Sequence, residues 1–65
     1  MYGIKVEAID AAKEQHDFFK EKGFEPIPIF HVIYADEAYH VVTNKYFHEN
    51  NGLKSLYSTE ELLKQ

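Results

Sequence analysis

Two short runs of strand-forming residues, separated by a polar pair, constrain this chain more than any other feature. Residues 27–42 read IPIFHVIYADEAYHVV, so Ile, Val, Phe and Tyr surround the pair Asp36-Glu37. β-Branched and aromatic residues favour strands, and a short polar break between two such runs is typical of a hairpin. We therefore predict a β-hairpin at the centre of a small sheet, with Ala35 and Ala38 flanking a two-residue turn.

This turn determines which residues face one another, because directly opposed side chains share one face of a sheet. The expected pairs are Tyr34 with Tyr39, Ile33 with His40, Val32 with Val41, His31 with Val42 and Phe30 with Thr43. An Asp-Glu pair is not a favoured turn sequence, so a longer loop or a bulge, which would shift the pairing, stays open. In the expected register one face is bulky and aromatic, which suits packing beneath a helix. That face carries Phe30, Val32, Tyr34, Tyr39, Val41 and Thr43.

The other face of the hairpin mixes apolar side chains with imidazoles, where a solvated face would show Lys, Glu or Ser. It carries Ile29, His31, Ile33, His40 and Val42. One helix covers one face of a sheet, so this second face stays open unless the C-terminal helix, a second copy or another partner lies on it. We predict that it is a binding surface, with Asp36 and Glu37 at its rim.

The amino-terminal third predicts a strand followed by a helix. Residues 2–6 alternate between apolar and polar side chains, as in a half-buried strand. A helix is expected from Ala8 or Asp10 to Lys22, because apolar side chains recur there at intervals of three and four residues. Gly23 is a natural helix stop.

The segment after the hairpin predicts further β structure and a short closing helix. Asn51-Gly52 is the strongest short turn signal in the chain, and it lies between two apolar segments. A last strand is expected over residues 53–57. A short helix is expected from about Glu60, since Ser58 and Glu61 have capping-box spacing.

Together these elements predict one α+β domain over residues 1–65. The expected order is β-α-β-β-β with a short C-terminal helix, in which three or four antiparallel or mixed strands form one sheet and the main helix packs on one face. A 65-residue chain without Cys has a marginal core and no disulfide to support it. We therefore expect efficient packing or association, with a homodimer as the expected form.

Charge and hydropathy narrow the class of protein. Seven Lys, no Arg and eleven acidic residues give a net charge of −4. Binding to nucleic acid draws on Lys and Arg, so it is the least favoured of the functions considered. Acidity is expected either to keep the chain in solution or to engage a basic partner. No apolar run approaches the roughly 20 residues that cross a bilayer, and no signal peptide is evident, so a cytoplasmic location is expected.

The four histidines are the candidates for acid-base or metal chemistry. In the expected register His31 and His40 are diagonal neighbours that could share a metal if Glu37, His48 or a residue of a second chain supplied a third ligand. No HxH, HExxH or HxxxH spacing occurs, and no glycine-rich phosphate loop or catalytic Cys is present. We therefore assign no catalytic residue, metal site or cofactor and expect no enzyme activity. A histidine-based metal-binding protein, or a small metal-assisted enzyme, is kept as the alternative.

Three stretches of the chain resemble a known family. The order of IPIFHVIYAD, VVTNKYF and LYSTEELL is similar to the tail of restriction-endonuclease-like domains of the Mrr and nuclease-related types, over about half of the chain. The catalytic signature of that family, an acid followed by Glu-x-Lys, is missing here, since neither Glu-x-Lys nor Asp-x-Lys occurs. We therefore assign no function of that family to this chain.

The sequence thus favours a small module that binds another protein, or a second copy of itself, through the open sheet face. Its size and lack of catalytic chemistry motivate a narrower hypothesis. In that hypothesis the chain is an inhibitor of a host protein, encoded by a phage or mobile element.

Overall fold

The predicted hairpin lies at the centre of the structure, a computed structural model in which residues 1–64 are described. Strands β1 (Phe30–Ala35) and β2 (Ala38–Thr43) pair antiparallel in the expected register. Asp36 and Glu37 form the two-residue turn with φ angles of 51° and 62°. Most residues avoid this left-handed region, so the apolar alternation of the two strands outweighs an unfavourable turn sequence.

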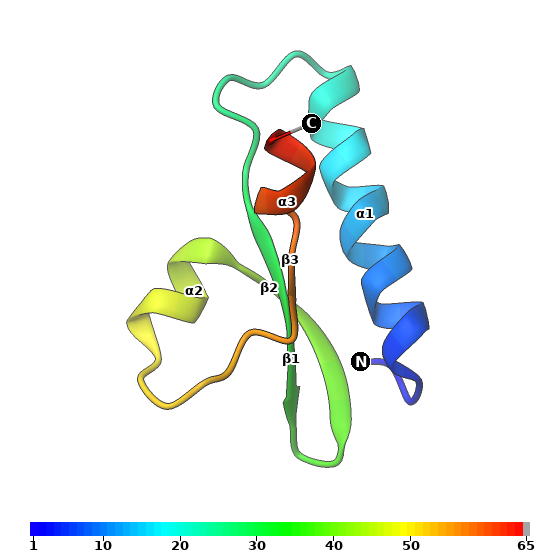
Figure 1. The fold of residues 1–65 in the computed structure, drawn as a ribbon, viewed down its shortest axis with the longest axis vertical. Coiled ribbons are helices and arrows are strands. Elements are labelled where there is room, and N and C mark those ends of the chain that lie inside the picture. The colour runs from blue at the N-terminus through cyan, green and yellow to red at the C-terminus, as the bar shows by residue number, and fades with distance from the viewer. Residues whose placement is uncertain (65) are drawn as a thin grey trace.

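A long helix covers one face of the sheet. The strand order is β2-β1-β3, in which β3 (Tyr57–Ser58) runs antiparallel to β1, and α1 (Lys5–Glu21) lies across this sheet (Figure 1). Small side chains on α1 allow it to approach the strands closely. The buried cluster between them consists of Ala8, Ala12, Phe30 and Val32. The α+β class is therefore confirmed. Of the face assigned to helix packing, Phe30, Val32, Tyr39 and Val41 pack in or against this cluster, whereas Tyr34 and Thr43 are exposed.

Contacts between distant segments hold β3 in place. The Phe30 N–H donates to the buried Thr59 hydroxyl at 2.8 Å, and the Thr59 N–H donates to the Phe30 carbonyl at 3.0 Å. The Lys13 ammonium lies 5.8 Å from the centre of the Tyr57 ring. Burial, and next the nearby Glu61 carboxylate, raise the pKa of the Tyr57 phenol above its ordinary value. No helix in residues 1–64 combines the length and apolar character needed to cross a membrane.

The prediction of a strand over residues 2–6 is wrong. Within this segment Tyr2 alone pairs with the sheet, through a single antiparallel bridge to Tyr39 with two N···O distances of 2.8 Å. Helix α1 already begins at Lys5, earlier than expected. Ile4 and Val6 are exposed, so the alternation that predicted a half-buried strand does not correspond to burial.

The segment after the hairpin also differs from its prediction. Residues that precede the Asn51-Gly52 turn form a short helix, α2 (Asn44–Glu49), and the last strand is limited to the two residues of β3. The Thr43 hydroxyl accepts the Tyr46 N–H at 3.1 Å, so an N-cap ends β2 and starts α2. The expected C-terminal helix is present as α3 (Glu60–Leu63).

Because of this change, the second face of the sheet is covered by the chain itself. Figure 1 shows α2 on the opposite side of the sheet from α1, followed by the segment that returns to β3. The structure thus has layers on both sides of β1, and its first four residues are buried.

Candidate binding site beneath the hairpin

The predicted binding surface is divided by this covering layer. His31 and Ile33 have only 6% and 4% of their surfaces exposed, so neither can contribute to an open face. His40 and Val42 are half-buried, whereas Asp36 and Glu37 are exposed. The expectation that this face is open is therefore wrong for its centre, because α2 and the segment after it were expected to be strands.

His31 connects β1 to this covering layer through both ring nitrogens. Its Nδ1 lies 2.8 Å from the Ser55 hydroxyl, and its Nε2 lies 2.8 Å from the Asn44 side-chain oxygen. The ring stacks on Phe47 with a centroid distance of 4.3 Å. These contacts position α2 and the segment around Ser55 against the sheet.

A serine, a histidine and an amide in a row also occur in nucleophilic catalysis. Here the imidazole is buried and stacked on Phe47, and the Ser55 hydroxyl donates a hydrogen bond to the Tyr57 carbonyl at 3.2 Å. We therefore interpret the hydrogen bonds of His31 with Ser55 and Asn44 as structural. Sequence reasoning missed Asn44 and Ser55, since their relation to His31 depends on where residues 44–56 fold.

Four of the seven predicted residues meet at a cavity of about 240 Å³ beneath the hairpin. It is lined by Ile33, Ala35, Asp36, His40, Val41, Val42, Tyr46 and Leu53. The walls are mostly aliphatic. Asp36, His40 and Tyr46 supply its polar side chains.

The hydrogen bond of His40 defines which nitrogen is available to a ligand. Its Nε2 lies 2.9 Å from the Ala35 carbonyl oxygen. A carbonyl only accepts, so Nε2 carries the proton, and in the neutral ring Nδ1 is left as an acceptor. The cavity thus combines aliphatic walls with the polar side chains of Asp36, His40 and Tyr46, and Asp36 among them is a carboxylate.

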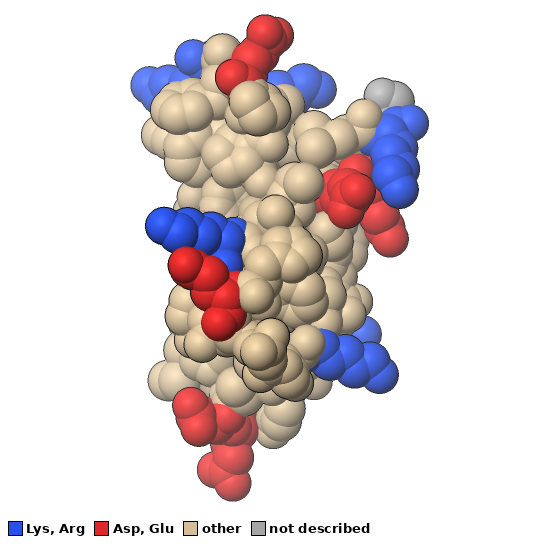
Figure 2. Space-filling model, turned by 90° about the vertical axis from the view of Figure 1, so that its left-hand side faces the viewer, with Lys and Arg blue, Asp and Glu red and all other residues tan. Residues whose placement is uncertain are grey.

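The remaining predicted residues lie elsewhere. Ile29 lines a second, apolar groove of about 390 Å³ together with the proline connector and Leu63 of α3. Glu37 is exposed at the tip of the turn. Figure 2 views the α2 side and shows a broad uncharged surface with acidic side chains at its lower end, where Figure 1 places the hairpin turn.

The two histidines considered for a metal site are diagonal neighbours, as the confirmed register requires. Both nitrogens of His31 and one nitrogen of His40 are already engaged. Within residues 1–64, no group of three or more His, Asp or Glu side chains is placed to hold a metal ion.

Comparison with known proteins finds no family model, curated protein or solved structure that matches this chain. The resemblance to restriction-endonuclease-like domains therefore remains one of sequence order. The function has to be argued from the residues and their geometry.

Proposed function

We propose that this chain is a protein-binding module whose binding site is the cavity beneath the hairpin. The observation that carries this proposal is the convergence of Ile33, Asp36, His40 and Val42 on one cavity with aliphatic walls and an acidic rim. Binding sites combine apolar walls with a few polar groups that orient the ligand.

The chemistry of the cavity indicates what a partner would present. Aliphatic walls of Ile33, Val42 and Leu53 favour a large apolar side chain. The carboxylates of Asp36 and Glu37 favour a neighbouring Lys or Arg, and the net charge of −4 assists approach to a basic surface. Occupation of a basic site on another protein is also how an inhibitor of this kind would act.

The backbone of the turn supports this proposal. Asp36 and Glu37 adopt left-handed φ angles, where Asn-Gly would be accommodated more easily. Sparsely populated backbone conformations are found preferentially at functional sites. Two acidic side chains at this position are therefore better explained by binding than by stability.

A random peptide library tests the proposal without knowledge of the partner. Peptides selected on the wild-type chain are expected to combine a large apolar residue with Lys or Arg. Their affinity should fall about tenfold or more on the double variant Asp36→Lys, Glu37→Lys, equivalent to roughly 1.4 kcal/mol or more. The measurement is peptide affinity by calorimetry or fluorescence anisotropy.

The matched control is Asp17→Lys with Glu14→Lys, which reverses two exposed charges on α1. This control should bind the selected peptides nearly as well as wild type. If both double variants lost the same affinity for the peptides, the change in net charge alone would explain the effect. Selection of peptides without basic residues would contradict the proposed partner chemistry.

A further inference from the structure

The outer edge of β2 is an unpaired part of the sheet. Strand order places β2 at one edge, and among residues 1–64 the structure pairs Tyr2 alone with that side, opposite Tyr39. Backbone groups of alternate residues point to the same side of a strand. The N–H and C=O of Val41 and Thr43 therefore point outward beyond Tyr2.

The two edges of the sheet differ in how they are protected. The edge formed by β3 is two residues long and leads directly into α3. The edge formed by β2 has six residues, AYHVVT, without a charged residue or a proline. Natural proteins usually shorten, charge or cover such edges, because a free edge pairs readily with another strand.

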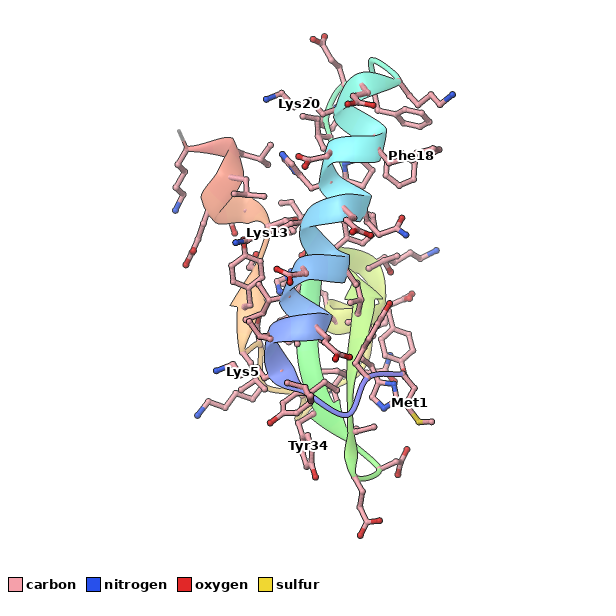
Figure 3. The ribbon with its side chains drawn as sticks, turned by 90° about the vertical axis from the view of Figure 1, so that its right-hand side faces the viewer. Met1, Lys5, Lys13, Phe18, Lys20 and Tyr34 are labelled. Atoms are coloured by element: carbon pink, nitrogen blue, oxygen red, sulfur yellow. The ribbon has the colours of Figure 1, made fainter. Side chains whose placement is uncertain are left out.

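A cavity of about 300 Å³ lies beside this edge, between α1 and β2. Its walls include Ala11 and Gln15 of α1 and Phe30 and Val41 of the sheet. Figure 3 shows Met1 beside β2, and Met1 is 88% exposed and lines this cavity. Apolar surface therefore flanks the unpaired backbone.

We infer that the β2 edge accepts an extended segment of another protein as a fourth strand, antiparallel to β2 and in line with Met1-Tyr2. Opposed residues of antiparallel strands share a face, and Val41 packs on the α1 side. The incoming residue opposite Val41 must therefore direct its side chain into the cavity beside α1. The recognised ligand is an extended segment with an apolar residue at that position.

An amino-terminal extension tests this edge in the intact chain. The residue two positions before Tyr2 would lie opposite Val41, and the residue four positions before it would lie opposite Thr43. Three added residues, Thr-Thr-Val before Met1, would therefore extend the Tyr2 bridge into a strand. Exchange of the Val41 amide hydrogen should slow about tenfold or more, equivalent to roughly 1.4 kcal/mol or more of protection.

The matched extension Thr-Thr-Pro keeps the carbonyl that would accept the Val41 N–H but lacks the N–H that would donate to the Val41 carbonyl, so the added strand should be weaker and Val41 exchange should slow less than with Thr-Thr-Val. A free peptide of alternating Thr and Val, with uncharged, blocked ends so that it does not pair with Asp36 or Glu37, then tests addition from another molecule. It should slow Val41 exchange in the unextended chain and have no effect on the Thr-Thr-Val extension, whose edge is occupied. The Asp36→Lys, Glu37→Lys variant should bind this peptide as wild type does, which separates the edge from the cavity beneath the hairpin.

Two results would overturn the inference. One is equal exchange of Val41 in the two extended chains. The other is a wild-type dimer, seen by sedimentation over a concentration series, in which Val41 is already protected, because the edge would then belong to a second copy.

Discussion

The two faces of β1 are both buried, but different interactions bury them. On one side the 17-residue helix α1 packs with Ala8 and Ala12 on Phe30 and Val32, a contact made by apolar atoms. On the other side the six-residue helix α2 and an irregular segment are positioned by two hydrogen bonds and a ring stack of His31.

This difference shows how each layer is specified. Apolar burial is non-directional, so a long helix with an apolar stripe can cover a sheet without one particular contact. A six-residue helix is too short to be stable alone and depends on its docking contacts. Hydrogen bonds of His31 are directional, and together with the backbone bonds from the Asn44 N–H to the Ile29 carbonyl and from the Leu56 N–H to the Val32 carbonyl they position this layer.

Truncation of the apolar layer should have the largest effect. Phe30→Ala is expected to cost about 3–5 kcal/mol, which is comparable with a total stability of roughly 3–10 kcal/mol for a chain of this length. The variant should therefore be partly or wholly unfolded at room temperature. Urea denaturation followed by circular dichroism measures the loss. Phe18→Ala, at an exposed position, is the control, and an equal loss there would contradict the core assignment.

Removal of the imidazole should have a smaller and more local effect. His31→Ala removes the hydrogen-bond partner of the Asn44 side-chain oxygen and one of the two partners of the Ser55 hydroxyl, at a cost of about 2–3 kcal/mol. Amide exchange should accelerate in α2 and around Ser55 more than in α1. The exposed Lys54, next to Ser55, is the control, and Lys54→Ala should change little.

A double-mutant cycle between His31 and Ser55 tests whether their hydrogen bond contributes to this loss of stability. Ser55→Ala alone is expected to cost about 1 kcal/mol, and the double variant should lose less than the sum of the two single losses. Additive losses, or an acceleration of exchange spread evenly over both layers, would show that His31 acts only through its volume.

The smallest effect is expected at the turn that both layers share. Replacing Asp36-Glu37 by Asn-Gly should stabilise the chain by about 0.5–1 kcal/mol, because both residues have positive φ. The urea midpoint should rise without a change in slope, and exchange should slow in both layers alike. A lower midpoint would show that the acidic side chains stabilise the turn.

The hairpin, its register and most of the face beneath α1 follow from local patterns in the sequence. Alternation with a period of two over two strands selects one register, since a shift by one residue would expose Phe30 and Val32. The helical spacing of apolar residues likewise predicted α1, although its first turn was missed. These signals are local and repeated, so single exceptions such as the Asp-Glu turn do not overrule them.

The layer that covers the second face depends instead on contacts between segments far apart in the chain. The sequence patterns in residues 43–57 are short and favour both strand and helix. The N-cap at Thr43 and the contacts of His31 stabilise the helix α2. The partners of His31 lie 13 and 24 residues away in sequence, at Asn44 and Ser55. Such pairs have no periodicity, so whether His31 faces a partner protein or its own chain depends on the docking of one short helix.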